Sequence, residues 1–194
     1  MISIELFQYS YIIDFEYKKN KGLLYLRQTR QYSPYLISLD TFVLEPFPMD
    51  NKPGTRVLER TKEFIIPHKP IHTVRKSCLH YGNSLKSATN TAKIFLNHRQ
   101  KVPIVIAYDH GRPLVFLPTM SANSEHNVWI ALHAISNYKT TKKGWCMIYL
   151  DYNLSIEVNV SQITFDRQYT LGALLEKEYK RKYGRLNGTS WPTE

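Results

Sequence analysis

The amino-acid sequence predicts an α+β fold that is rich in β-structure, with mostly antiparallel strands, one central helix and one C-terminal helix. Ile2–Tyr17 alternates loosely between apolar and polar residues and is rich in β-branched and aromatic side chains, and Val102–Tyr108 is a continuous apolar run; both patterns favour strands. Two stretches, Leu85–Asn97 and Ser161–Tyr183, show the periodicity of an amphipathic helix. With 194 residues, of which 43% are hydrophobic, the chain is long enough to bury a core.

The N-terminal part is predicted to form strands. Ile2–Tyr17 alternates loosely, Asn20-Lys21-Gly22 is a turn signal, and Leu23–Leu26 is expected to return as the partner strand. Tyr35–Leu44 is expected to hold one or two more strands. Glu45–Gly54 contains three prolines and a glycine, which predicts a loop and a subdomain boundary. The division that follows is an N-terminal β subdomain, 1–50, either separate from the rest or continuous with it, a basic β/α core, 55–184, and a loose tail, 185–194.

The middle of the chain is predicted to run from strand to turn, helix and hairpin. Pro67 and Pro70 frame an extended segment that Ile71–Val74 continues, after the ambiguous stretch Val57–Ile66. Gly82-Asn83-Ser84 predicts a turn in which Asn83 or Ser84 supplies the N-cap oxygen of the helix Leu85–Asn97. The following hairpin is expected to comprise Val102–Tyr108, the turn Asp109–Arg112 and Leu114–Leu117.

The C-terminal part is predicted to add strands and a second helix. The strands are expected at Val128–Ile135, Trp145–Leu150 and Ile156–Val160, with Lys139–Gly144 as a connection. The helix from Ser161 to Tyr183 is expected to end at Gly184 and to bury Leu171, Leu174, Leu175 and Tyr179.

Positive charge is concentrated in one third of the chain. Residues 1–60 carry eight Lys/Arg and seven Asp/Glu, residues 61–120 carry nine and two, and residues 121–194 carry nine and seven. The middle third therefore supplies +7 of the net charge of +10. Such a local excess indicates a polyanionic partner.

Catalytic and metal-binding motifs are absent from the sequence. It contains no glycine-rich phosphate loop, nucleophile elbow or HExxH helix, so we expect no enzyme, no cofactor and no metal. Pro70 separates His68 from His72, and Cys78 is interpreted as a buried apolar residue. Two distant cysteines, no signal peptide and no apolar run of membrane-spanning length predict a soluble cytoplasmic protein without a membrane partner.

The predicted central helix carries a polar stripe that suits nucleic acid. Lys86, Asn90, Lys93 and Asn97 fall on one face, where lysines can neutralise phosphates and asparagine amides can donate to phosphates or base edges. A solvated helix face is the alternative interpretation of the same stripe. No helix-turn-helix is predicted, because one helix lies in the basic third. Hairpins and loops would then share the contact with DNA, as in many minor-groove readers.

Other basic and aromatic residues are assigned to structure first. The cluster Lys139–Lys143 is interpreted as a solubility feature, with entry of a hairpin tip into a groove as the alternative. The triplet Lys180–Lys182 is assigned to the negative end of the C-terminal helix dipole. Trp129 and Trp145 are assigned to core packing.

Several motifs in this chain resemble those of one family. Lys69-Pro70, followed by Val74-Arg75-Lys76-Ser77-Cys78-Leu79-His80-Tyr81-Gly82-Asn83-Ser84, resembles the K-P and I-V-x-x-S-C-x-x-F-G-S-S signature of the competence transcription factor (ComK) family. Lys101-Val102-Pro103-Ile104 is similar to its K-x-P-I, Phe116–Ser121 to its F-x-P-T-x-S, and Trp129-Ile130 to its W-I. The resemblance covers residues 66–182 in the same order.

The resemblance implies a bacterial activator of DNA-uptake genes. Members of that family bind paired A/T-rich boxes of double-stranded DNA through the minor groove as homo-oligomers, dimers or tetramers. It also implies RNA polymerase and a proteolytic adaptor as partners, and a nucleoid-associated location in the cytoplasm. Two departures stand out: Ser87-Ala88-Thr89 replaces the family's G-R-K, and the tail after Tyr183 lacks an apolar adaptor-binding motif.

The leading hypothesis is a sequence-specific DNA-binding activator whose DNA-binding part is the 55–184 core. The rival hypothesis is a paralogue that has lost DNA binding and modulates a related activator through protein–protein contacts. An RNA-binding module would need exposed aromatic platforms, which the sequence does not assign. The candidate DNA-binding residues are Lys69, Arg75, Lys76, Asn83, Ser84, Lys86, Lys93, Arg99, Lys101 and Arg112.

Overall fold

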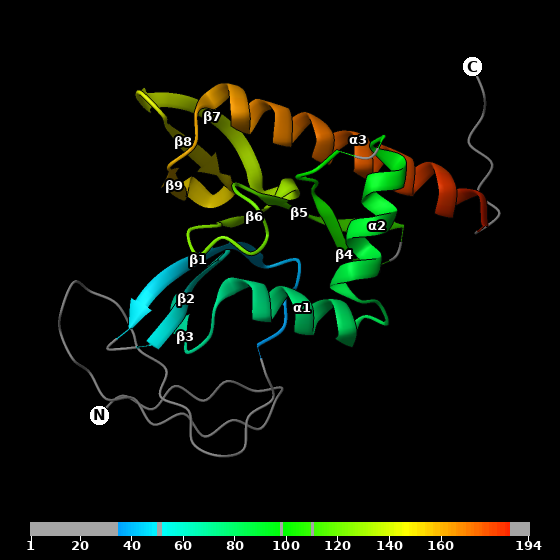
Figure 1. Ribbon diagram of the computed structural model, residues 1–194, viewed down its shortest axis with the longest axis horizontal. Helices are drawn as coiled ribbons and strands as arrows, with labels where there is room; N and C mark the ends of the chain where they lie inside the picture. Colours follow the sequence, from blue (N-terminus) through cyan, green and yellow to red (C-terminus); the bar gives the residue numbers. More distant parts are fainter. Residues whose placement is uncertain (1–34, 50–51, 98, 110, 187–194) are drawn as a thin grey trace, which may run out of the picture.

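The computed structural model describes residues 35–49, 52–97, 99–109 and 111–186. These ranges contain three α-helices and nine strands: two of the helices follow the first three strands, and the third follows the last strand (Figure 1). In chain order the elements are β1 (Thr41–Met49), β2 (Lys52–Glu59), β3 (Glu63–Ile66), α1 (Pro70–His80), α2 (Leu85–Phe95), β4 (Ile104–Asp109), β5 (Arg112–Pro118), β6 (Trp129–Ala131), η1 (Leu132–Ala134), β7 (Ile135–Lys142), β8 (Trp145–Leu150), η2 (Asp151–Asn153), β9 (Ser155–Val158) and α3 (Gln162–Leu186).

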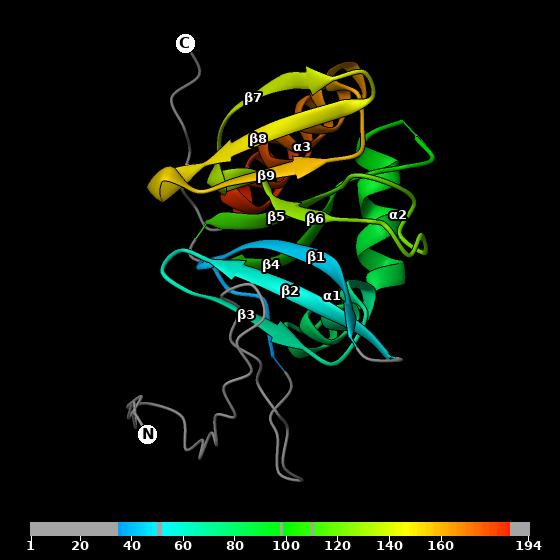
Figure 2. The same cartoon turned by 90° about the vertical axis from the view of Figure 1, so that its left-hand side faces the viewer.

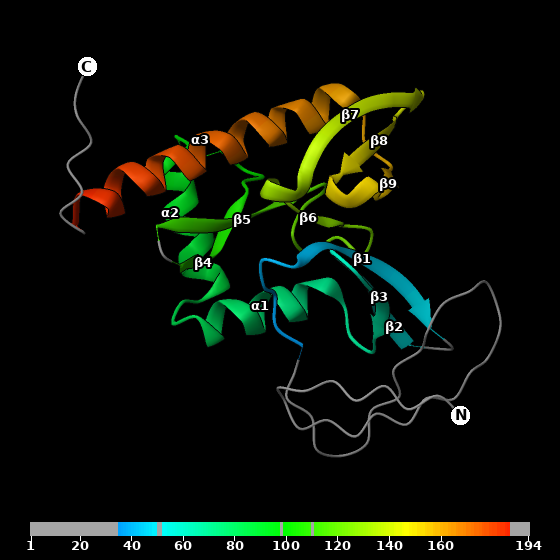
Figure 3. The ribbon, with the colours of Figure 1, turned by 180° about the vertical axis from the view of Figure 1, so that it is seen from behind.

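The strands form two antiparallel sheets. The larger has the order β3-β2-β1-β6-β5-β4, and the smaller has the order β7-β8-β9. Helices α1 and α2 pack against β4, and α1 also contacts β1, whereas α3 packs against β5 and the smaller sheet (Figures 2 and 3). The predicted β-rich α+β class is confirmed. The basic third, however, holds two helices and not one.

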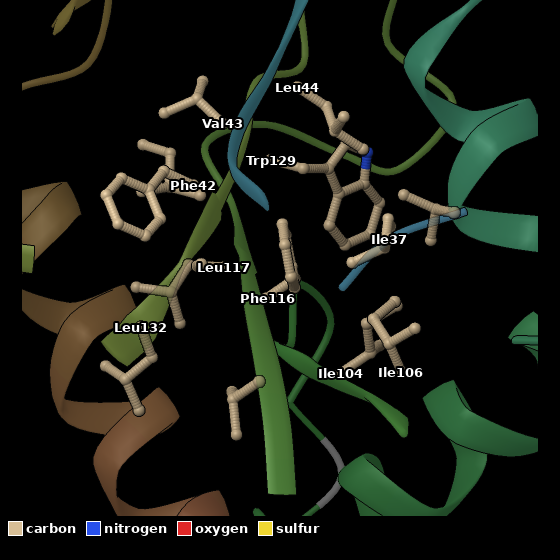
Figure 4. Packing of buried hydrophobic residues seen from close by; sticks show 14 of the residues in the cluster. Ile37, Phe42, Val43, Leu44, Ile104, Ile106, Phe116, Leu117, Trp129 and Leu132 are labelled. Carbon is tan, nitrogen blue, oxygen red and sulfur yellow. The ribbon is translucent and has the colours of Figure 1, made fainter. Parts of the chain in front are cut away.

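The core lies on both faces of the larger sheet (Figure 4). Alternate residues of a strand point to opposite faces, so Phe116 lies with Trp129 and Ile37 beneath α1 and α2, while Leu117 lies with Leu132 beneath α3. At Gly172 of α3 a Cβ atom would collide with the side chain of Leu117. A glycine is therefore needed in this helix, despite its low helix propensity, for the close approach of α3 to β5.

The loop predicted at Glu45–Gly54 is wrong for its described residues, because 45–49 lie in β1 and 52–54 lie in β2. Pro46 pairs with Thr55, and Pro48 pairs with Pro53. Strand β1 pairs with β6 only at Val43 and Leu44, so, among the described residues, the stretch with the prolines has no strand on its other side. A proline, which lacks the N–H donor, is tolerated at such an open edge.

The extended segment predicted from Pro67 to Val74 is also wrong beyond Lys69. Helix α1 begins at Pro70, and a proline in the first helical turn is favourable because its missing N–H would have no partner there. The buried residues follow helical spacing, but several are small or polar and gave no hydrophobic stripe. They are Pro70, Thr73, Val74, Ser77 and Cys78.

The remaining elements confirm most of the predicted ones. Helix α2 and strands β4, β5, β8 and β9 lie where they were expected, within a few residues at each end. The predicted connection Lys139–Gly144 is mostly strand, because β7 continues to Lys142 and only the turn at Gly144 follows. Helix α3 continues through the predicted stop at Gly184 to Leu186, and Leu174 is 43% exposed, not buried.

Several expectations fall outside the described residues. These are the strands predicted within 1–34, the turn Asn20-Lys21-Gly22 and most of the loose tail after residue 186. The described part of 1–50, residues 35–49, contributes β1 to the larger sheet. The division of the chain into domains stays a prediction.

Candidate nucleic-acid interface

Helix α1 is fixed along one face and leaves two cations on the other. The hydroxyl of Ser77 accepts a hydrogen bond from the backbone N–H of Ile37 at 2.9 Å, which joins the helix to the segment before β1. Val74 and Cys78 are fully buried on the same face. Arg75 and Lys76 are exposed on the opposite face.

A short turn connects α1 to α2. Gly82 adopts a φ of 76°, and the N–H of Asn83 donates to the carbonyl of Cys78 at 2.9 Å. The hydroxyl of Ser84 accepts from the N–H of Ser87 at 3.0 Å, so Ser84 is the N-cap of α2, as predicted. Two helices joined by a four-residue turn that contains glycine are compatible with a helix-turn-helix. The reason for excluding that motif, a single helix in the basic third, was wrong.

Helix α2 presents three members of the predicted polar stripe, Lys86, Asn90 and Lys93, whereas Asn97 lies beyond the end of the helix and has a φ of 54°. Ala88 and Ala92 are fully buried against the core, whereas Lys86 and Asn90 are exposed and Lys93 is partly buried. The first turn of the helix contains no acidic residue. The Asn83 and Ser84 side chains make local hydrogen bonds within the turn, which gives both residues a structural role in placing this stripe.

The segment that contains both helices has no acidic residue. Between Glu63 and Asp109 the sequence contains seven Lys or Arg and no Asp or Glu. We call α1, α2 and the loop 96–101 the helical flank; its outward cations are Arg75, Lys76, Lys86, Lys93 and Arg99. Within the described ranges, none of these five cations forms an ion pair with a carboxylate.

Beside the loop that follows α2 lies an open hollow of about 650 Å³, lined in part by Arg99, Lys101 and Arg167. The Lys101 ammonium donates to the carbonyl of Thr119 at 2.9 Å. Burial lowers the pKa of Lys101, and the nearby charge of Arg167 lowers it further. Among the residues that the structure describes, no carboxylate lines this hollow, so it has the electrostatic character of an anion site.

Gln168 is a buried residue that also lines the hollow. Its side-chain amide donates to the carbonyl of Lys101 at 3.4 Å, and its Oε1 atom is buried without a hydrogen-bond partner among the described residues. Sequence reasoning missed Arg167 and Gln168, because both lie on α3, far from Lys101 along the chain. No local sequence signal joins these residues.

Two of the candidate residues do not belong to the helical flank, Lys69 before α1 and Arg112 at the start of β5. The Lys69 ammonium forms an ion pair with Glu125 at 2.6 Å. In the strand register, Arg112 lies opposite Asp109, next to the turn of the β4–β5 hairpin, whereas Lys101 lies near the other, open end of this hairpin. Six residues of extended strand separate these ends, a distance of roughly 20 Å. Eight of the ten candidates therefore lie along α1, α2 and the segments between and after them, namely Arg75, Lys76, Asn83, Ser84, Lys86, Lys93, Arg99 and Lys101, whereas Lys69 is ion-paired and Arg112 lies on a hairpin.

The groups considered for chemistry have structural surroundings. Cys78 is fully buried, as predicted, and burial raises the pKa of its thiol to about 11. His68 is partly buried, and desolvation lowers its pKa. Across the described ranges, no three His, Cys, Asp or Glu residues lie close enough to hold a metal ion. None of the helices in these ranges has the length and hydropathy of a membrane span.

The fold and the flank define a class: a β-rich α+β protein with an acid-free cationic surface formed by two helices. Residues 32–184 match the family model described as ComK protein. The chain therefore belongs to the ComK family. It is similar to the competence transcription factor of Bacillus subtilis (strain 168), with 21% identity over 146 residues that cover 75% of each chain. No solved structure matches.

The residues that carry the family resemblance lie mainly in the core and in turns. Cys78 and Phe116 are fully buried, and Trp129 is 1% exposed. Gly82 has the left-handed backbone conformation that favours glycine. The shared motifs therefore describe how this fold is held together more than what its surface contacts.

Proposed function

We propose that this protein is a DNA-binding transcription factor and acts as an activator, without enzymatic activity. The similar protein in Bacillus subtilis is named a competence transcription factor. The observation that carries the proposal is the helical flank: its five outward cations have no ion-pair partner within the described ranges, and the segment from Lys69 to Lys101 contains no acid. Such a surface suits the phosphates of double-stranded DNA.

The flank suggests how the contacts are divided. The exposed cations of α1 and α2 meet phosphates, and the start of α2 directs backbone N–H groups toward the same charges. Arg99 lies on a loop and is exposed. A single arginine on a loop fits a narrow minor groove better than a helix does, because that groove is only about 6 Å wide. We assign A/T-rich duplex recognition to this loop.

The finer features follow from the family resemblance. We propose paired A/T-rich boxes as the target and a homo-oligomer, a dimer or a tetramer, as the binding species. We further propose a nucleoid-associated location in the cytoplasm, with RNA polymerase and a proteolytic adaptor as protein partners.

A gel-shift titration tests the proposal. Binding of A/T-rich and G/C-rich duplexes is compared over a range of salt concentrations. Neutralisation of five to eight phosphates predicts that log K falls against log salt with a slope of roughly −5 to −7, and that the A/T-rich duplex binds more tightly. Absence of binding to either duplex at moderate salt would contradict the proposal.

The rival function is a paralogue that modulates a related activator through mixed oligomers. One observation favours it: Ser87-Ala88-Thr89 stands where the family has a basic pair, and here Ala88 is buried and the hydroxyl of Thr89 donates to the carbonyl of Leu85 at 2.7 Å. This rival predicts no duplex binding, but co-purification with the related activator.

A further inference from the structure

The hairpin formed by β7 and β8 carries basic residues that the helical flank does not include. We call residues 135–150 the ribbon. Its turn follows Lys142 and consists of Lys143 and Gly144, whose φ is 81°. Lys139, Lys142 and Lys143 are exposed. We propose that the ribbon makes a second contact with the phosphate backbone of the duplex; this rests on the proposed DNA-binding function.

The two faces of the ribbon differ sharply. Residues 146, 148 and 150 of β8 are buried toward α3, whereas Trp145, Met147 and Tyr149 are half-buried on the outer face. Strand β7 is the outer strand of its sheet, with β8 on one side only. Its residues from Lys139 to Lys142 are all exposed. This strand therefore offers its exposed side chains to a partner.

Aromatic rings hold two of the ribbon lysines in place. The ammonium of Lys142 lies 4.4 Å from the centroid of the Trp145 ring, and that of Lys139 lies 5.3 Å from the centroid of the Tyr149 ring. Cation–π attraction limits the freedom of both side chains, so less entropy is lost when they meet a phosphate. The ring faces covered by lysine are not open to stacking bases. This arrangement favours a duplex backbone over a single strand, which would need exposed rings.

Acidic residues neutralise little of this charge. Glu157 lies on the neighbouring strand β9, where it accepts a hydrogen bond from Thr141 at 2.6 Å and lies 3.9 Å from the Lys142 ammonium. Asp166 of α3 accepts from the hydroxyl of Tyr138 at 2.6 Å. Lys143 forms no ion pair with the residues that the structure describes. The ribbon therefore keeps a net positive charge.

The ribbon is fixed next to the hollow of the helical flank. The Gln162 side chain, at the first residue of α3, accepts hydrogen bonds from the backbone N–H and the hydroxyl of Thr140 at 2.9 and 2.8 Å. The following turns of α3 supply Thr164 and Arg167 to the hollow. Figure 2 shows the turn of the ribbon, the start of α3, and helices α2 and α1 in succession along the right-hand side of the molecule. One duplex along this side can contact both cationic surfaces.

The test compares two double variants of the full-length chain that remove the same charge. K142A/K143A removes two ribbon lysines, and K177A/K180A removes two exposed lysines from the middle of α3. Counterion release of about 0.9 per phosphate predicts a slope shallower by about two for the ribbon variant and an unchanged slope for the control. K142R/K143R, which keeps charge and cation–π contact, is expected to bind like the unmodified protein. Thermal unfolding of each variant verifies folding.

Each outcome decides a different question. An unchanged slope for K142A/K143A, while the unmodified protein binds duplex, overturns the ribbon proposal and leaves the proposed function standing. Equal flattening in K177A/K180A also overturns it, because the effect would then follow net charge and not position. Failure of the unmodified protein to bind any duplex overturns the proposed function, and the ribbon proposal with it.

Discussion

The cations of the strands β1–β3 and those of the helical flank have opposite surroundings. On the strand side, the Arg56 guanidinium contacts both Glu45 and Glu63 at 2.7 Å, and Arg60 pairs with Asp40 at 3.2 Å. On the helical flank, the cations from Arg75 to Arg99 have no carboxylate partner among the described residues. The cations beside β1–β3 therefore stabilise the fold through ion pairs, whereas those of the helical flank remain accessible to an anionic partner.

The difference arises from sequence order and strand register. The hairpin register places Glu45 directly opposite Arg56, and the pairing of β2 with β3 brings Glu63 close to it. Opposite charges on adjacent strands stabilise a sheet. The contacts with Glu63 and Glu45 also raise the pKa of Arg56 against the effect of its burial. In α1 and α2, an acidic residue one helical turn away could have paired with each cation, but the sequence places no Asp or Glu there.

Neutralising the helical flank is expected to have the largest effect. K86A/K93A removes two proposed phosphate contacts, which lowers duplex affinity by roughly 60-fold at about 0.1 M salt, since each contact contributes about 0.9 to the salt slope. The loss should be similar for all sequences, because phosphates carry no sequence information. Gel-shift titration measures it. If affinity and slope match those of the unmodified protein, α2 does not contact the duplex.

Arg56→Met is expected to produce the reverse pattern. Methionine replaces the apolar stem of the arginine but leaves Glu45 and Glu63 without their half-buried cation. This loss should lower the free energy of unfolding by about 2 kcal/mol. Duplex affinity should not change. Urea unfolding and gel-shift titration measure the two quantities. A drop in affinity with unchanged stability would reverse the assignment of the two regions.

Glu125→Gln tests whether Lys69, which is ion-paired in the free protein, can contact the duplex. It releases Lys69, whose ammonium now pairs with Glu125, and one additional phosphate contact would raise affinity by up to about eightfold at 0.1 M salt. Lys69 lowers the pKa of Glu125. The carboxylate is therefore charged at neutral pH, and the ion pair is lost only as the pH falls through that lowered pKa. Unchanged affinity in the variant at pH 7 would place Lys69 outside the interface.

Ser84→Ala is expected to have the smallest effect, both on duplex affinity and on the free energy of unfolding. Loss of the N-cap hydrogen bond to Ser87 should lower the free energy of unfolding by about 1 kcal/mol. Ser84→Asn retains a capping oxygen and should restore that stability. Circular dichroism during urea unfolding measures the difference. Equal stability of the alanine variant would mean that packing alone positions the start of α2.

The sequence predicted α2 well and α1 badly, for a physical reason. In α2 the apolar residues repeat with helical spacing and a serine precedes them. In α1 the same spacing is filled by Thr73 and Ser77, whose hydroxyls hid the buried face. The prolines of β1 suggested a loop. They are compatible with a strand only at an unpaired edge, and the sequence does not show which edges of a strand are unpaired. Contacts between residues far apart in the sequence could not be predicted either: neither the Lys69–Glu125 ion pair nor the approach of Arg167 to Lys101 has a local sequence signal.

Lysine acetylation of the protein, free and bound to an A/T-rich duplex, shows whether the helical flank contacts DNA. Mass spectrometry reports every lysine in one sample, so the two regions act as controls for each other. We expect the duplex to protect Lys76, Lys86 and Lys93, while Lys62 and Lys177 react equally with and without DNA. If Lys62 or Lys177 is protected as strongly as the flank lysines, or if the flank lysines are not protected, the helical flank is not the duplex-binding surface.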